Sequence, residues 1–264
     1  MPKPETCRLS LLTAYRNRPS HLGLLLDWLS RARQQDGFAD FELILAEGDN
    51  HPTALAMCEA HGWVRYIFVE MGDLFNKSVL LNRAASVARG TFVMPLDIDL
   101  LPGRNVLSKH VSLAERSVAC LLSGFRIQLP SLPDPVEWGG CAEIAKKLDR
   151  TDPSLICEED RYATGLVERL LDRRRFGVCP CFLAERFHAA GGYHEGYVGW
   201  GAEDQDLIER ICATGIYLVR CYDLLYFHMP HPAREPGWRD ERLTAANRAL
   251  YFSRRKSWMT DIHG

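Results

Sequence analysis

Apolar residues in the first part of this chain form short continuous runs that alternate with segments of helical spacing. A short apolar run bounded by polar or turn-forming residues is typical of a strand that is buried on both faces. Such runs predict strands at 8–14, 41–47, 64–69 and 90–96. The intervening segments predict helices at 21–34, 53–61 and 76–89. Strands and helices that alternate in this way favour an α/β fold with a mostly parallel central sheet.

The second part of the chain alternates less regularly. Its apolar runs predict strands at 119–127, 178–183 and 217–220. Helices are expected at 184–189, 204–213 and 239–258. Residues 130–160 are rich in proline and then in charge, and we interpret about 130–172 as a helical insertion. The predicted organisation is a single domain over 1–264, with one half at about 1–103, the other at about 104–235 and a C-terminal helical tail at 236–264.

Composition and charge argue against several classes of function. The formal net charge is −2, so no overall basic field indicates a nucleic-acid partner. Neither a Gly-x-Gly-x-x-Gly after the first strand nor a Walker-type loop occurs, which disfavours dinucleotide and P-loop sites. No apolar run reaches the length of a membrane span, and residues 1–20 lack the apolar core of a signal peptide. The nine cysteines are scattered, which fits reduced thiols, and we therefore expect a cytoplasmic protein.

The strand expected at 90–96 leads into two acidic residues, Asp97 and Asp99, and then into a turn signal at 100–103. In an open α/β sheet, ligands bind beyond the carboxyl ends of the strands. Carboxylates at such a place suit a hard divalent cation, which can also bridge to phosphate oxygens. The alternative interpretation is an acidic turn that caps the segment after it.

Glycines crowd the segment 191–201, which leads directly into Glu203 and Asp204. Glycine permits backbone turns that other residues adopt at a cost, and Trp200 offers an apolar face that can stack on a sugar ring. One interpretation is that the acids cap an ordinary helix, because the helix dipole favours carboxylates in the first turn. The other is a carboxylate held beside an aromatic platform, placed to take a proton from a hydroxyl group.

Two histidines, His228 and His231, follow an apolar run late in the chain. Histidine commonly completes a cation site that carboxylates begin, and Mn²⁺ accepts such mixed ligands. Histidines next to proline also occur in ordinary turns. Taken alone, this pair leaves both interpretations open.

Together, these motifs resemble those of a known group of enzymes. The matching segments, in chain order, are Arg16-Asn17-Arg18 with His21-Leu22, Phe75-Asn76-Lys77, Asp97-Ile98-Asp99, Gly199-Trp200-Gly201-Ala202-Glu203-Asp204 and the late histidine. This order resembles the GT-A-fold glycosyltransferases, specifically the C-terminal region of the β-1,4-galactosyltransferases and similar bacterial (family 2-like) sugar transferases. The resemblance covers about residues 7–232. It implies a Rossmann-like GT-A fold in which the insertion lies on the acceptor side.

The resemblance also implies a role for each matched residue. Asp99 would bind Mn²⁺ (or Mg²⁺), with His228 as the better-placed second ligand and His231 as the reserve. Asp204, beside Glu203, would be the base that deprotonates the acceptor hydroxyl. The residues implied for nucleotide-sugar binding are Thr13, Tyr15, Arg16, Arg18, Glu47, Asp49, Asn76, Lys77, Asp97, Trp200 and Gly201. Two positions depart from the family pattern, since Ala202 replaces the usual glycine and Gln205 replaces an acid.

The expected activity is a metal-dependent, inverting transfer of a hexose or N-acetylhexosamine, with galactose or GalNAc favoured, from a UDP-sugar donor. The expected acceptor is a hydroxyl of a glycan or of a lipid-linked saccharide, at the inner face of the membrane. One alternative is a retaining enzyme like the polypeptide N-acetylgalactosaminyltransferases, although those carry Asp-x-His where this chain has Asp97 and Asp99. Another is a non-catalytic sugar-binding module on the same fold, which would be expected to lose Asp99, Asp204 or the late histidine.

Overall fold

The structure is a computed structural model that describes residues 6–129, 131–132, 178–231 and 240–260. Apart from residues 131–132, the insertion expected at about 130–172 lies outside the described residues. The elements in chain order are β1 (Cys7–Tyr15), α1 (Pro19–Gln35), β2 (Phe41–Asp49), α2 (Leu55–Glu59), β3 (Val64–Glu70), α3 (Lys77–Ser86), β4 (Gly90–Pro95), β5 (Leu100–Pro102), α4 (Val106–Arg116), β6 (Cys120–Gln128), β7 (Val178–Leu183), α8 (Ala184–Ala189), α9 (Glu203–Cys212), β8 (Tyr217–His228) and α10 (Glu241–Thr260).

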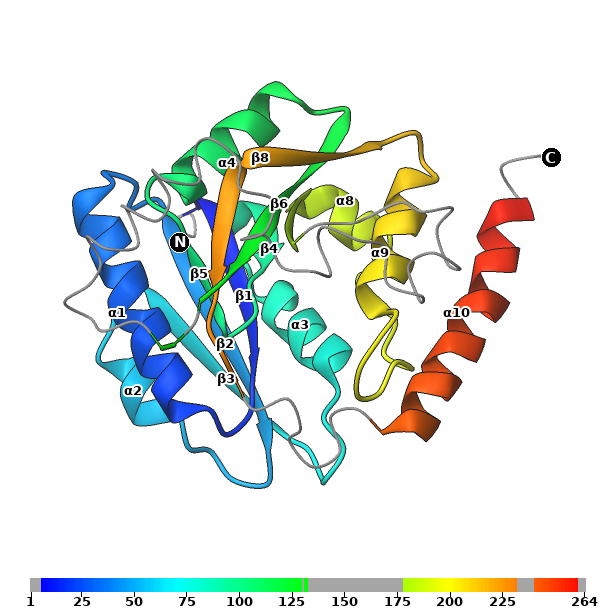
Figure 1. Cartoon of the computed structure of the whole chain (residues 1–264), viewed down its shortest axis with the longest axis horizontal. Coiled ribbons are helices and arrows are strands. Elements are labelled where there is room, and N and C mark those ends of the chain that lie inside the picture. Colours follow the sequence, from blue (N-terminus) through cyan, green and yellow to red (C-terminus); the bar gives the residue numbers. More distant parts are fainter. Residues whose placement is uncertain (1–5, 130, 133–177, 232–239, 261–264) are drawn as a thin grey trace, which may run out of the picture.

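The strands form one eight-stranded sheet in the order β3-β2-β1-β4-β7-β6-β8-β5, which curls through the molecule (Figure 1). The first four strands pair in parallel, as the alternation of strands and helices predicts. β7 is antiparallel to both β4 and β6, and β5 is antiparallel to β8. The α/β prediction is therefore confirmed, but the sheet is mixed. The direction from which a distant strand joins a sheet depends on its connection and not on its local apolar pattern.

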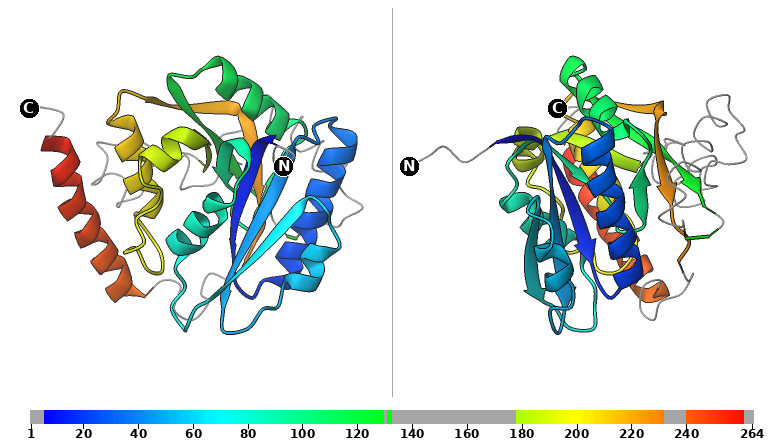
Figure 2. Two further views of the ribbon diagram at one scale, coloured as in Figure 1. Left: turned by 180° about the vertical axis from the view of Figure 1, so that it is seen from behind. Right: turned by 90° about the vertical axis from the view of Figure 1, so that its left-hand side faces the viewer.

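Alternate side chains of the central strands serve two separate core layers. In β1, Leu9 and Leu11 pack with the apolar faces of α1, α2 and α4, whereas Leu12 packs with those of α3, α8 and α9. This follows from the period of two in a strand. Figures 1 and 2 show α1 and α2 on one side of β1–β3 and α3 on the other. Both faces of the sheet are thus covered, and polar groups at its carboxyl edge remain available for a ligand.

The expected turn at 100–103 is wrong. Leu100–Pro102 forms the short strand β5, which pairs with β8 in the register Leu100↔His228. β8 also continues to His228, well beyond the expected strand at 217–220. A strand this short is recognisable only from its partner, which lies far away in the sequence. The pairing matters for function because it brings the end of β8 beside Asp99.

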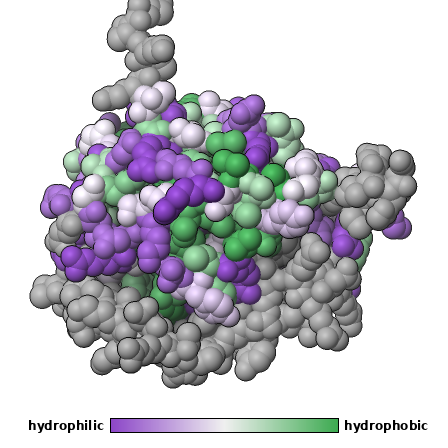
Figure 3. Space-filling model, turned by 90° about the horizontal axis from the view of Figure 1, so that it is seen from above, coloured by the Kyte–Doolittle hydropathy of each residue, from purple (hydrophilic) through white to green (hydrophobic). Residues whose placement is uncertain are grey.

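On the face seen from above, neither hydrophilic nor hydrophobic residues cover the whole surface. Figure 3 shows hydrophilic and hydrophobic residues intermixed there, with a small hydrophobic patch near the middle. Among the described residues, exposed apolar side chains include Val118, before β6, and Tyr217, at the start of β8. Among the described helices, none combines the length and apolar character needed to cross a membrane.

Candidate active site

Two clusters of polar side chains lie side by side beyond the carboxyl end of β4. We call Asp99, His228 and His231 the metal-ligand cluster. We call Lys77, Asp97, Glu203 and Asp204 the acidic cluster. Asp97 and Asp99 belong to the same short loop after β4, so the two clusters are neighbours along the backbone.

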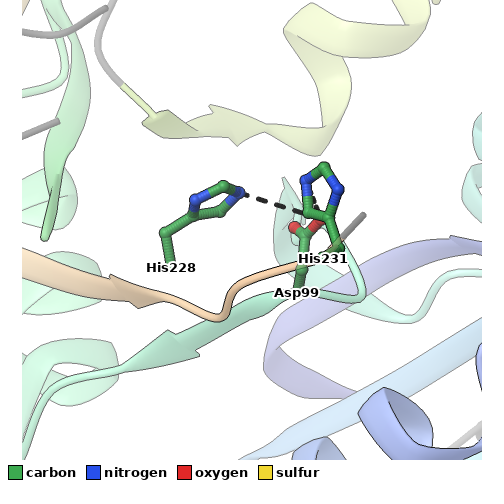
Figure 4. Close-up of side chains that lie close together, drawn as sticks. All are labelled: Asp99, His228 and His231. Atoms are coloured by element: carbon green, nitrogen blue, oxygen red, sulfur yellow. Dashed lines mark ion pairs between the residues drawn. The ribbon is translucent and has the colours of Figure 1, made fainter. Parts of the chain in front are cut away.

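The metal-ligand cluster is positioned by the pairing of β5 with β8. His228 is the last residue of β8, and the backbone N–H of Met229 donates to the Asp99 carbonyl at 2.8 Å. One ligand atom from each of Asp99, His228 and His231 lies within 4.8 Å of the others. Nε2 of His231 is 3.4 Å from Asp99 Oδ2, and Nε2 of His228 is 3.8 Å from the same oxygen. Figure 4 shows both rings directed toward the carboxylate.

This donor set fits a divalent transition metal. One carboxylate oxygen and two imidazole nitrogens suit Mn²⁺ better than Mg²⁺, which prefers oxygen ligands only. A histidine must be unprotonated at the nitrogen that binds a metal. Burial lowers the pKa of His228, although the Asp99 carboxylate opposes this change. The ring is therefore held toward the form that can coordinate.

Arg18 forms an ion pair with the carboxylate of Asp99. Its Nη1 lies 2.9 Å from Asp99 Oδ2, and both side chains are only 11% exposed. The sequence predicts a role for Arg18 toward the donor, and the structure places its guanidinium group on the carboxylate of Asp99. The partly buried Asp99 charge is thus neutralised by a guanidinium group.

The acidic cluster is assembled from a loop and two helix N termini. Asn76 caps α3 by accepting a hydrogen bond from the Val79 N–H, so that Lys77 is the first residue of the helix. Lys77 Nζ lies 3.0 Å from Asp97 Oδ1, 3.2 Å from Asp204 Oδ2 and 3.5 Å from Glu203 Oε1. The structure therefore brings together four residues that the sequence assigns to donor binding and catalysis.

One ammonium group, that of Lys77, faces three carboxylates in the acidic cluster. Because it cannot neutralise all three, the pKa values of Glu203 and Asp97 shift in opposite directions. Burial and then the charge of Asp204 raise the pKa of Glu203 to about 7. Burial alone would also raise the pKa of Asp97, but Lys77 outweighs it and holds that pKa below its usual value. Asp204 is the more accessible of the helix pair, with 37% of its side chain exposed against 12% for Glu203.

The loop before α9 adopts the backbone conformations that its glycines allow. Gly199 and Gly201 have φ values of 72° and 109°, in the left-handed region. Ala202 has φ 74°, so the glycine usual in the family would fit this position with less strain. Asn247 of α10 donates to the carbonyl oxygens of Val198 and Trp200. The tail helix thus fixes the loop that contains Trp200 and leads to Glu203 and Asp204.

The other residues predicted to bind the nucleotide make bonds within the scaffold. Thr13 donates to the Leu96 carbonyl, and Arg16 donates to carbonyl oxygens in β2 and in the loop between β3 and α3. Glu47 is fully buried and accepts hydrogen bonds from Thr53, Ala54 and Tyr66. Tyr15 is buried too, which raises its pKa, and Asp49 accepts from the Asn50 N–H. These bonds join the carboxyl ends of β1 and β2 to neighbouring loops, outside both clusters.

Tyr193 and Gln128 also lie at the site and are not among the residues that the sequence predicts. The Tyr193 hydroxyl is buried, and burial and the Asp204 charge raise the Tyr193 pKa well above its usual value. Its position in the glycine-rich segment is a usable signal. Gln128, at the end of β6, contacts Nδ1 of His228 at 2.7 Å. No local pattern marks Gln128, because the contact depends on the pairing of β6 with β8.

Comparisons with known proteins agree with this fold. A family model described as the N-terminal domain of galactosyltransferase matches residues 169–232, which include Trp200, Asp204 and both histidines. The uncharacterized glycosyltransferase YfnE of Bacillus subtilis (strain 168) is 23% identical over 273 residues, covering 90% of this chain and 69% of YfnE.

Solved structures share the fold at low sequence identity. TarS 1-349 of S. aureus in complex with UDP-GlcNAc has a TM-score of 0.60 and 14% identity, over 86% of this chain and 60% of that one. The mannosyltransferase PcManGT from Pyrobaculum calidifontis, in complex with GDP-Man and Mn²⁺, has a TM-score of 0.54 and 18% identity, over 94% and 63%. The chain thus spans less than two thirds of each of these structures. The fold is the GT-A fold, and the sequence matches are to glycosyltransferases.

Proposed function

We propose that the protein is a metal-dependent, inverting glycosyltransferase that uses a UDP-sugar donor. The observation that carries this proposal is the adjacency of the two clusters. A metal site at Asp99 and an accessible carboxylate at Asp204 flank the same loop residue, Asp97. A cation for the leaving diphosphate and a base for the acceptor hydroxyl are the two groups that such a transfer needs.

Asp99, His228 and His231 would hold the metal, with Mn²⁺ favoured over Mg²⁺. When bound, the metal would neutralise negative charge on the diphosphate of the leaving nucleotide. Arg18 pairs with Asp99 and Lys77 pairs with Asp97, and both cations would contact the phosphates. The roles of Thr13, Tyr15, Arg16, Glu47, Asp49, Asn76, Asp97, Trp200 and Gly201 in nucleotide-sugar binding stay predictions.

Asp204 would act as the base. Its carboxylate takes the proton of the acceptor hydroxyl as that oxygen forms a bond to the anomeric carbon. The bond from this carbon to the UDP oxygen breaks on the opposite face, and UDP leaves with the electron pair, so the configuration is inverted. Greater exposure favours Asp204 over Glu203.

Galactose or GalNAc is the proposed sugar, because the family model is described as a galactosyltransferase domain. The proposed acceptor is a glycan or lipid-linked saccharide, used by a cytoplasmic enzyme at the inner face of the membrane. The proposed division of labour assigns about 1–103 to the donor and about 104–235 to the acceptor.

The decisive experiment measures nucleotide release from a panel of UDP-sugars, with Mn²⁺, Mg²⁺ or EDTA present. GDP-mannose is included because PcManGT was solved with GDP-Man. We expect Mn²⁺-dependent release from UDP-galactose or UDP-GalNAc, and less from other donors. If no UDP-sugar is consumed under any of these conditions, the proposed function is wrong; release from GDP-mannose alone would reassign the donor.

A further inference from the structure

Gln128 and His228 face each other at the end of two paired strands. They are the last residues of β6 and β8, and they are direct partners in the parallel pairing of these strands. The Leu129 N–H also donates to the His228 carbonyl at 2.9 Å, which continues the pairing beyond β6. The sheet therefore places the Gln128 side chain against the ring of a proposed metal ligand.

The surroundings of Gln128 determine which way its amide points. Nε2 of Gln128 lies 3.3 Å from the Leu129 carbonyl and 3.3 Å from the His228 carbonyl. Carbonyl oxygens only accept hydrogen bonds, so the NH₂ group must be the end that faces them. The other end, Oε1, then faces Nδ1 of His228 at 2.7 Å.

This orientation selects one form of the imidazole ring. Because Oε1 can only accept, Nδ1 of a neutral His228 must carry the hydrogen. Nε2 is then left with its lone pair, and this is the nitrogen that lies 3.8 Å from Asp99 Oδ2. The opposite tautomer would present an N–H to the metal position and would break the bond to Gln128.

We propose that Gln128 is a positioning residue that selects the Nδ1–H tautomer of His228 and so prepares Nε2 to bind the metal. The proposal rests on the metal site of the proposed function and extends it to a residue outside the ligand set. Partners that accept from the outer nitrogen of a histidine ligand commonly fix its ring and raise its basicity. Here strand register supplies that partner.

The first test reads the tautomer in the metal-free protein by ¹H–¹⁵N NMR with labelled histidine. We expect His228 to show the Nδ1–H form in the natural chain and to shift toward the Nε2–H form in Gln128→Met. Gln128→Glu retains an acceptor and should keep the Nδ1–H form. Gln34→Met, at an exposed position near the far end of α1, is the matched control.

The second test measures Mn²⁺ affinity by titration calorimetry without any nucleotide. Gln128→Met should weaken binding by about 10- to 100-fold, the usual effect of losing such a partner. Gln128→Glu should stay close to the natural chain, as should Gln34→Met. If Gln128→Met keeps both the tautomer and the affinity, or if Gln128→Glu loses as much affinity as Gln128→Met, the proposal is overturned.

Failure of the proposed function gives a different result. A chain that binds Mn²⁺ and responds to Gln128 as expected, but consumes no UDP-sugar, would refute the activity and leave the role of Gln128 intact. A natural chain with no saturable Mn²⁺ binding would overturn the metal site and the role of Gln128 together.

Discussion

The metal-ligand cluster and the acidic cluster share one loop, but the fold builds them in different ways. Strand register sets the first, because β8 pairs with β5 on one side and with β6 on the other and ends at His228. Helix N termini set the second, because Lys77 opens α3 and Glu203 and Asp204 open α9. One cluster is therefore part of the sheet, and the other depends on how two helices approach it.

Their charges differ as well. In the metal-ligand cluster, the Asp99 carboxylate is matched by the Arg18 guanidinium group at 2.9 Å. In the acidic cluster, three carboxylates share the Lys77 ammonium group, and the pKa of Glu203 rises to about 7. The first cluster is balanced without a metal, whereas the second carries excess negative charge. We conclude that metal binding and proton transfer should respond to separate substitutions.

The strongest separation is expected from Asp204→Asn. The amide cannot take a proton, so the transfer rate should fall by about 10²- to 10⁴-fold, the usual contribution of a general base. Calorimetry should show that binding of UDP and Mn²⁺ is retained, since the metal-ligand cluster is untouched. Asp223→Asn, at an exposed position on β8, is the control. An equal loss of UDP binding and of transfer would contradict the assignment of Asp204 as the base.

Substitution of either histidine should instead weaken metal binding directly. Both Nε2 atoms converge on Asp99, so His228→Ala and His231→Ala should each weaken Mn²⁺ binding, as should Asp99→Ala. The loss should reach about 100-fold, the upper range for loss of a supporting partner alone. Titration of Mn²⁺ followed by electron paramagnetic resonance measures it directly. An unchanged affinity in His228→Ala, with a loss in His231→Ala, would make His231 the ligand.

The raised pKa of Glu203 in the acidic cluster should make the stability of the protein depend on pH. The folded-state pKa of Glu203 is raised to about 7 from an ordinary 4.5, so the folded protein holds this proton where the unfolded chain has lost it. Stability from this group is therefore present below pH 4.5 and is lost as the pH rises through about 7.

The variant Glu203→Gln cannot titrate at this position, so it should not lose this part of its stability as the pH rises. Between pH 5 and pH 8, the melting temperature of the variant should rise relative to that of the natural chain by about 2 °C or more, the shift that about 1 kcal/mol gives in a domain of this size. Groups that titrate in both proteins cancel in the difference. Parallel pH profiles for the two proteins would show that Glu203 does not titrate in this range.

The sequence predicts the fold better than it predicts the contacts at the site. The strands from β1 to β4 are visible because each is a buried apolar run with its own boundaries. β5 is not visible, because its three residues become a strand only through pairing with β8. The register that joins Asp99 to His228 is for the same reason beyond local patterns.

The functional residues show the same difference between what the sequence predicts and what only the structure gives. The residue types of Asp99, Asp204 and His228 and their order along the chain carry the family resemblance, and that resemblance predicts a metal and a base. The partners of the cations are not predictable, since Arg18 and Lys77 suit phosphate by type but lie on carboxylates in the structure. Arg16 likewise suits phosphate, yet its guanidinium group binds carbonyl oxygens of the scaffold. Side-chain type indicates the chemistry, and only tertiary placement gives the partner.

The smallest expected effect concerns Arg18 and has an unusual sign. Arg18 and a metal ion would both draw on Oδ2 of Asp99, so the ion pair competes with metal binding. Arg18→Met should therefore strengthen Mn²⁺ binding in the absence of nucleotide by up to about fivefold, the change that corresponds to an ion pair worth about 1 kcal/mol. UDP binding in the presence of Mn²⁺ should weaken, because a proposed phosphate contact is lost.

Calorimetric titration of Mn²⁺ alone, followed by UDP on the loaded protein, separates these two effects. Arg31→Met, within helix α1, which begins directly after Arg18, is the matched control. If Arg18→Met weakens Mn²⁺ binding, the guanidinium group supports the ligand geometry and does not compete for the carboxylate. The balance of charge that distinguishes the metal-ligand cluster from the acidic cluster would then be a requirement for metal binding and not an obstacle to it.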